Sequence, residues 1–211
     1  MTTAPRPEAP SGADQRRDQM LAAAAELIAE RGYSETRIAD VAKRVGASSA
    51  LVVYYFGTKD SLLAEALRYS ENLFYDVADE MLAQTPGVRE QLELLVHLTC
   101  VPEGTEKELP GAWGLWFDLW AQAFRHPEIS KDRLEFDRRW RDTISGVLDA
   151  GIKAKEIPKT DTKAFAMTFA ALLDGLSIQV ALEDPDIDPD KAFAIAMDFA
   201  DSALQLPKAK R

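Results

Sequence analysis

The chain has 211 residues, 46% of them hydrophobic, and carries a formal net charge of −10. This size and composition are typical of a globular protein with one or two domains and a sizeable core. The single cysteine, Cys100, excludes an internal disulfide framework, and the apolar run from Ala164 to Leu173 is shorter than the roughly 20 residues of a membrane span. We therefore expect a cytoplasmic protein without a membrane partner.

The N-terminal part begins with residues 1–13, which are rich in proline and predict a disordered arm. Residues 14–31 then show helical periodicity, and Gly32 follows as a helix terminator. The apolar stripe of this helix consists of Met20, Leu21, Ala24, Leu27 and Ile28.

Residues 36–59 contain two short helical patterns on either side of a glycine. The first pattern has Ile38, Val41, Ala42 and Val45 on one face. Gly46 then favours a left-handed turn, and Ser48 or Ser49 offers an oxygen to cap the second helix. A short helix, a tight turn and a second short helix predict a helix-turn-helix, whose second helix fits a DNA major groove.

This stretch resembles the DNA-binding domain of TetR-type transcriptional regulators, most specifically over residues 55–63. Val53 stands where many members have a tyrosine, and Tyr54 beside it is a candidate substitute for that tyrosine's phosphate contact. The matching residues are Thr36, Ile38, Ala39, Val41, Ala42, Gly46, Ser48, Tyr55, Phe56, Lys59, Leu62 and Leu63.

The resemblance and the residue chemistry together indicate which side chains contact DNA. Thr36, Arg37 and Lys59 are expected to contact phosphates, although helix capping by Thr36 and plain solvent exposure of the two cations remain alternatives. Ser49, Ala50 and Tyr54 are expected to face base edges, because hydroxyls, methyl groups and aromatic rings all have partners in the major groove. Ser48 and Tyr55 complete the predicted DNA-binding set.

The negative charge is concentrated away from this stretch. Residues 1–70 contain nine basic and nine acidic residues, and the remainder contains 16 basic and 26 acidic ones. Residues 36–59 have four basic residues against Asp40 alone. Attraction to phosphate can therefore be local, while the rest of the protein repels DNA.

From Lys59 to about Gln84 we expect one long helix, capped by Thr58 and able to connect two domains. Its predicted apolar side chains include Leu62, Leu63, Ala66, Leu67, Leu73, Phe74, Val77 and Met81. Further helices are expected near 88–101, 112–125, 127–155, 161–182 and 189–206. The chain is thus predicted to be all-α, with about nine helices and no strand.

The predicted organisation has four parts: the arm 1–13, a helix-turn-helix domain 14–58, a helical effector-binding and dimerisation domain 59–206, and a frayed basic tail 207–211. The second domain resembles the C-terminal domain of the BetI-like branch of the family. The resemblance rests on Trp113 to Arg125, His126-Pro127, Arg139 to Arg141 and Leu173 to Leu176.

An effector pocket and a dimer interface are both expected in the second domain. Aromatic residues at helical spacing are more often core than ligand site, but regulators of this kind carry a ligand-responsive cavity. The pocket candidates are Phe74, His97, Trp113, Phe117, Trp120, Trp140 and Gln179. Residues of the last two helices are candidates for packing into a four-helix bundle across a twofold axis, although the core of the protomer is the alternative and some of them must belong to it. The interface candidates are Phe165, Phe169, Leu172, Leu176, Val180, Phe193 and Met197.

The sequence argues against an enzyme, because two histidines, one cysteine and no glycine-rich phosphate loop leave little acid–base or nucleophilic machinery. We expect no cofactor and no metal. The preferred function is a homodimeric repressor that binds a palindromic double-stranded DNA operator and is released by an unknown small-molecule effector. The alternatives are an activator of the same family and a helical small-molecule-binding protein without a DNA role.

Overall fold

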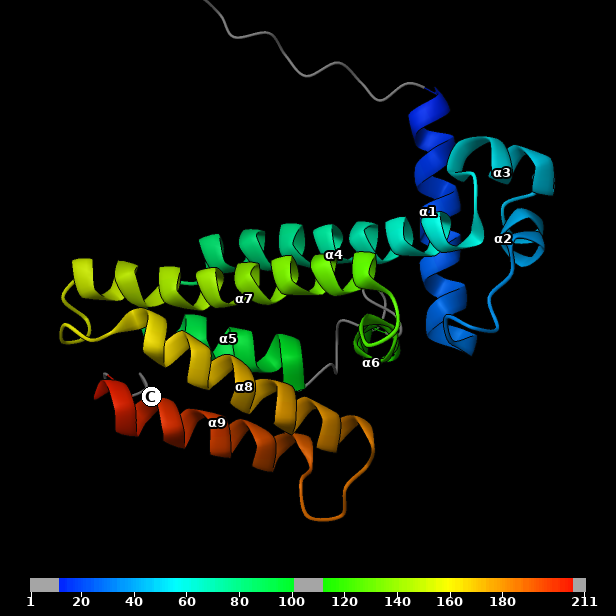
Figure 1. Cartoon of the computed structure of the whole chain (residues 1–211). Coiled ribbons are helices and arrows are strands. Elements are labelled where there is room, and N and C mark those ends of the chain that lie inside the picture. Colours follow the sequence, from blue (N-terminus) through cyan, green and yellow to red (C-terminus); the bar gives the residue numbers. More distant parts are fainter. Residues whose placement is uncertain (1–11, 101–111, 207–211) are drawn as a thin grey trace, which may run out of the picture. The chain divides into compact units, whose positions relative to one another are not determined.

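The computed structural model describes residues 12–100 and 112–206, and over these ranges all regular secondary structure is helical (Figure 1). The predicted all-α fold with about nine helices is confirmed. The helices are α1 (Gly12–Arg31), α2 (Ile38–Arg44), α3 (Ser49–Phe56), α4 (Lys59–Gln84), α5 (Val88–Cys100), α6 (Ala112–Ala123), α7 (Pro127–Lys153), α8 (Thr162–Ala181) and α9 (Pro189–Leu204).

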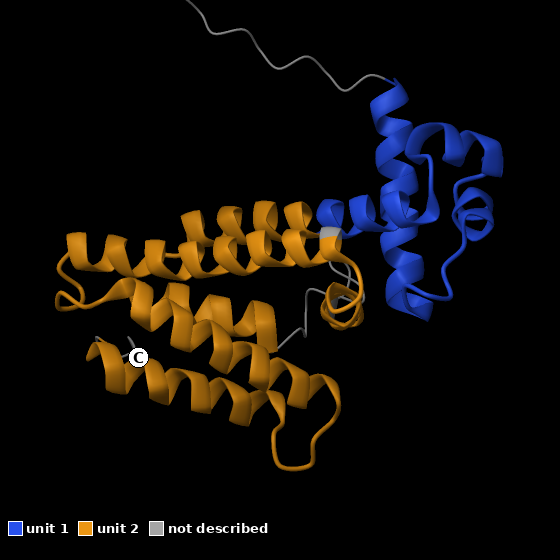
Figure 2. Cartoon of the chain, in the orientation of Figure 1, with its two compact units in different colours: residues 1–70 blue, residues 71–211 orange. Residues whose placement is uncertain are grey.

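The chain forms two compact units, residues 1–70 and 71–211 (Figure 2). The division between these units falls inside α4, between Ser70 and Glu71. The predicted domain boundary lies at the start of that helix, after residue 58. Most of the predicted arm (residues 1–11) and the predicted tail (207–211) lie outside the described residues.

The first unit packs α1, α2, α3 and the start of α4 around one core. The predicted stripe of α1 is buried, and so is Tyr33 in the loop that follows. The other helices contribute Val41, Ala42, Val52, Phe56, Leu62, Leu63, Ala66 and Leu67 to this core. Thr58 caps α4 as predicted, since its Oγ1 accepts a hydrogen bond of 3.1 Å from the amide of Ser61.

The second half of α4 differs from its predicted pattern. Leu73 and Met81 are exposed, whereas Tyr75, Ala78 and Leu82 are buried. The buried stripe therefore follows the spacing 71, 75, 78, 82, which places Glu71 on the apolar side of the helix. The sequence pattern was ambiguous here because large apolar residues occur all around the helix.

In the second unit, α5, α7, α8 and α9 share a hydrophobic core, and α6 packs against α7. Asp161 and Asp188 cap α8 and α9 by accepting hydrogen bonds from the amides of Ala164 and Lys191. Arg89 of α5 forms an ion pair with Asp201 of α9. The four tryptophans of the chain all belong to this unit.

Among the described residues, α8 is the one helix that is long and apolar enough to cross a membrane by length and composition alone. Its buried face, which includes Phe165, Phe169 and Leu173, packs into the core with α5, α7 and α9. Such a helix is typical of the interior of a helical bundle, and its apolar character extends to a second, exposed face.

Candidate nucleic-acid interface and effector region

The second helix of the predicted helix-turn-helix, α3, presents a distinct outward face. Ser48 is its N-cap, and the Ser48 Oγ accepts a hydrogen bond of 3.2 Å from the amide of Leu51. Ser49 and Ala50 are exposed at its first turn, and the exposed fractions of Val53 and Tyr54 are 44% and 82%. The opposite face holds the buried Val52 and Phe56.

Val53 was not among the predicted contact residues, although it lies one turn after Ser49 on the same face. Its i, i+4 relation to Ser49 is the signal that could have identified it. Tyr55 is partly buried, and its ring lies against that of Tyr54, with 5.6 Å between the ring centroids. The outward face of α3 therefore consists of Ser49, Ala50, Val53 and Tyr54.

Two glycine turns set the position of α3. Gly46 has φ +62°, its amide bonds to Lys43 O at 3.3 Å, and the amide of Ala47 bonds to Ala42 O at 2.8 Å. This pair of bonds is a Schellman motif, the helix ending that favours glycine. Gly57 has φ +74° and ψ −69°, and the amide of Thr58 bonds to Phe56 O across it at 2.9 Å, which makes a γ-turn.

The three predicted phosphate contacts lie in different environments. Arg37 is exposed at the N-cap position of α2. Thr36 is fully buried, and its hydroxyl donates to Gly32 O at 2.9 Å, so its side chain is occupied in a structural contact. Lys59 is partly exposed and donates from Nζ to Ser34 O at 2.8 Å, which leaves two of its three hydrogens for other acceptors.

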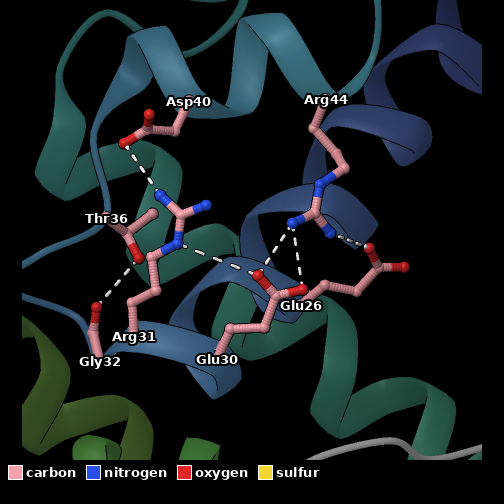
Figure 3. Close-up of polar contacts among 7 residues, drawn as sticks. All are labelled: Glu26, Glu30, Arg31, Gly32, Thr36, Asp40 and Arg44. Atoms are coloured by element: carbon pink, nitrogen blue, oxygen red, sulfur yellow. Dashed lines mark hydrogen bonds and ion pairs between the residues drawn. The ribbon is translucent and has the colours of Figure 1, made fainter.

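Not every cation of this unit is equally available to DNA (Figure 3). Arg44 lies 2.9 Å from carboxylate oxygens of both Glu26 and Glu30 in α1. Its hydrogen bonds hold the pKa of Glu30 below the ordinary value. Arg31 similarly lies 3.6 Å from Asp40. The cations left to attract phosphate include Arg37, the exposed Lys43, Lys59 and Arg16, whose guanidinium donates to Gln19 Oε1 and to Gly46 O.

In the second unit, aromatic side chains of α4, α6 and α7 form two groups of ring contacts, which we together call the aromatic row. The ring of Phe74 meets that of Trp140 at 6.2 Å, and Trp116 links α6 to Phe136 of α7 at 6.4 Å. Tyr75 links the two groups through its hydroxyl, which donates to the backbone carbonyl oxygen of Phe136 at 3.4 Å. The row consists of Phe74, Tyr75, Trp116, Phe117, Trp120, Phe136 and Trp140.

The aromatic row includes four of the predicted pocket residues, Phe74, Phe117, Trp120 and Trp140. The side chain of Trp113 lies outside the described residues. His97 is exposed on α5, where its ring stacks on Phe193 of α9 at 4.8 Å. Gln179 of α8 donates to Gly175 O at 3.1 Å. No described contact connects these two polar residues to the aromatic row.

Sequence reasoning missed the most unusual polar group of this region, Glu71. Its side chain is buried, and among the described residues its Oε1 has no hydrogen-bond partner. Burial raises the pKa of Glu71 to about 8, although the nearby positive charge of Arg139 acts in the opposite direction. The signal that could have found it is an acidic residue on the stripe that leads through Tyr75 to Ala78 and Leu82.

Arg139 of α7 covers the ring of Tyr75, with its Cζ 4.0 Å from the ring centroid. Its Nη1 donates to Asn72 Oδ1 at 3.0 Å. The guanidinium is thus held by an aromatic face and an amide, as cation–π geometry favours, rather than by the Glu71 carboxyl.

Most of the predicted interface residues of α8 and α9 are buried in the core of the second unit. Phe165, Phe169, Leu176, Val180 and Met197 are buried, and only Leu172 and Phe193 are partly exposed. The exposed face of α8 instead carries Ala164, Met167, Thr168 and Ala171, spaced as neighbours on one side of a helix. Met167 is 65% exposed.

Known proteins match both parts of the chain. Residues 20–66 match the bacterial regulatory proteins of the tetR family, and residues 88–205 match the C-terminal domain of BetI-type transcriptional repressors. The HTH-type transcriptional regulator BetI of Burkholderia lata is 29% identical over 190 residues, which cover 90% of this chain and 94% of that protein.

Solved structures agree with these matches. A transcriptional regulator from Saccharomonospora viridis, crystallised in complex with choline, is 30% identical and superimposes with a TM-score of 0.80, covering 92% of this chain and all of that one. A TetR transcription regulator from Haloarcula marismortui is 25% identical, with a TM-score of 0.77 over 91% of this chain.

Proposed function

Since the chain belongs to the TetR family of bacterial regulators and has a BetI-type C-terminal domain, we propose that it is a homodimeric repressor that binds a palindromic operator and is released by a small organic cation. The family consists of transcriptional regulators rather than enzymes. Action on chromosomal DNA places the protein in the cytoplasm.

The outward face of α3 is the observation that carries the DNA-binding role. Its small first-turn residues allow close approach to base edges, and the Tyr54 ring and hydroxyl extend further into the groove. Arg37, Lys43 and Lys59 supply positive charges that bind the phosphate backbone of the DNA. These cations are the proposed phosphate contacts, and the outward face of α3 is the proposed base contact.

A dimer follows from how little one such helix can read. One recognition helix contacts only a few base pairs, and twofold dimers obtain specificity from half-sites about one helical turn, or a multiple of it, apart. We assign the dimer contact to the exposed apolar stripe of α8, namely Ala164, Met167, Thr168 and Ala171, because pairing across a twofold axis would cover it.

The effector is assigned to the region of the aromatic row. A choline complex of a 30% identical relative supports a cationic small molecule, and aromatic rings favour such ligands through cation–π contacts. A ligand that binds more tightly to the conformation of the free protein than to the DNA-bound conformation shifts the population away from the operator. Since α4 contributes to both units, displacement of its second half is the proposed route of coupling.

Selection of bound sequences from random duplex DNA tests the central claim. We expect an inverted repeat, and we expect choline to lower affinity for the selected site in a gel-shift titration. A helical carrier without a DNA role would enrich no sequence. A direct repeat or a single half-site would overturn the twofold arrangement. Transcription in vitro from a promoter that contains the site should fall when the protein is added, whereas an activator would raise it.

A further inference from the structure

The carboxyl of Glu71 is the buried polar group that the proposed function leaves unexplained. The residue is 5% exposed, and its Oε1 meets no donor among the described residues. One turn further along α4, Tyr75 is also buried and points its hydroxyl at α7. Glu71 therefore lies at the α4 end of the aromatic row.

Burying a carboxyl group costs free energy unless the group has a partner. A buried carboxyl oxygen without a hydrogen bond loses its hydration and gains nothing in return, so structural carboxyls in protein interiors are normally paired. Arg139 is the cation whose charge lowers the pKa of Glu71, yet its guanidinium lies on the Tyr75 ring and bonds to Asn72. Glu71 Oε1 is thus an acceptor without a donor at one end of a series of aromatic rings. A carboxylate together with aromatic rings suits a small organic cation.

We propose that Glu71 is the counter-charge for the cationic effector, and that the effector takes the place of the proton which this carboxyl carries in the free protein. This inference rests on the proposed function, because it requires a cationic effector. The O–H bond of the carboxyl breaks, the proton passes to solvent, and the resulting carboxylate forms an ion pair with the bound cation. No covalent bond to the ligand is made.

The electrostatic setting explains why the proton is present before binding. Burial raises the pKa of Glu71 to about 8, so the carboxyl is mainly uncharged at neutral pH. After burial, the groups that act on the pKa of Glu71 are Arg139 of α7, which lowers it, Asp137 of α7, which raises it, and Tyr75 of α4, whose hydrogen bond to the carboxyl lowers it. Around Asp137 lie Arg133, Arg141 and Asp174 of α8, and the pKa of Asp174, raised by desolvation to about 6, is below the pH range used here.

Binding should therefore depend on pH in a defined direction. Below the pKa of the free carboxyl the cation must displace a proton, so affinity rises with pH, and above that pKa it levels off. With a free-state pKa of about 8, affinity should rise about tenfold between pH 7 and pH 9, with release of about 0.9 proton at the lower pH and about 0.1 at the higher.

Calorimetric titration of the full-length protein with choline measures both quantities, because the charge of choline does not change with pH. Each pH is run in two buffers of different ionisation enthalpy, which reports the protons released. Glu71→Gln should abolish proton release, remove the pH dependence and lower affinity at pH 9 by at least about tenfold. This variant keeps the shape and the neutral state of the side chain, so it should fold.

Two controls separate the outcomes. Glu80→Gln changes an exposed glutamate of the same helix and should bind like the wild type. The neutral analogue of choline, with carbon in place of nitrogen, should bind more weakly at pH 9 and release no proton. Choline binding that is independent of pH and unaffected by Glu71→Gln would overturn the role of Glu71 and leave the proposed effector class standing. Absence of choline binding at every pH would overturn both.

Discussion

Two residues of the DNA-binding unit, Tyr54 and Lys59, are expected to contribute to affinity in different ways. The Tyr54 side chain is 82% exposed on α3, where it can reach base edges. Lys59 begins α4, and its proposed contact is with the phosphate backbone of the DNA. Base contacts set sequence preference, whereas phosphate contacts set affinity for all sequences and its dependence on salt.

Lys59→Ala should accordingly weaken binding to every duplex and reduce the slope of log affinity against log salt by about one unit per protomer. Tyr54→Ala should change the preferred bases and leave the salt slope intact. Both are measured by fluorescence anisotropy with operator and scrambled DNA at several salt concentrations. Because Lys59 also bonds to Ser34 O, its variant needs a thermal melt as a control for folding. An altered base preference with an unchanged slope for Lys59→Ala would contradict this assignment.

At this scale the sequence predicts residues whose role depends on local spacing and misses those whose role depends on neighbours. The capping by Ser48 and the exposure of Ser49, Ala50 and Tyr54 follow from helical periodicity and were expected. The burial of Thr36 was not, because its hydroxyl bond to Gly32 O depends on how the loop folds back. Glu71 was missed for a similar reason: its environment comes from α7, far away in the sequence.

Among the elements, the turns on either side of α3 hold it by different backbone geometries. Gly46 lies in the left-handed region, which asparagine also tolerates, and a Cβ there would meet nothing within 4 Å. Gly57 has positive φ with strongly negative ψ, outside that region, although a Cβ there would also lie in open space. Any penalty for substitution therefore arises from backbone strain rather than from a clash.

Gly46→Ala should lower the free energy of unfolding by about 1 kcal/mol, and Gly46→Asn should lower it less. Gly57→Asn should be more harmful than Gly46→Asn, because the γ-turn offers asparagine no favourable conformation. Urea denaturation followed by circular dichroism compares the variants. Equal losses for the two asparagine variants would mean that the two turns constrain the backbone alike.

Element boundaries were predictable because capping residues and helix-ending glycines mark them locally. The limits of α4 match the expected Lys59 and Gln84, α8 begins directly after the expected Asp161, and α9 begins at the expected Pro189. Asp188, the residue that caps α9, was not predicted. The inward faces were harder to assign. In α4 both Leu73 and Tyr75 fit a helical stripe, and only packing against α7 selects Tyr75. The same difficulty applies to Phe165 and Phe169, which were predicted for a dimer interface with the protomer core as the alternative; both are buried within the protomer.

For the whole molecule, the proposed dimer depends on the exposed stripe of α8. Met167→Glu would place a charge at the centre of an apolar contact between copies, which is unfavourable without a partner charge. We expect this variant to sediment as a monomer and to lose operator affinity, because a single protomer reads only one half-site. Leu134→Glu, a similar change at an exposed position of α7, should leave the dimer intact. A dimeric Met167→Glu protein would place the interface elsewhere.

The confinement of every indole to one unit makes the protein its own optical sensor. Selective excitation of tryptophan reports on the surroundings of α6 and α7, while α3, whose aromatic residues are two tyrosines and one phenylalanine, is not excited. If tryptophan emission changes when operator DNA alone is added, DNA binding by the first unit alters the second unit. The measurement needs no attached dye. Unchanged emission with operator, together with quenching by choline, would indicate that choline alters the surroundings of the tryptophans and that operator binding alone does not.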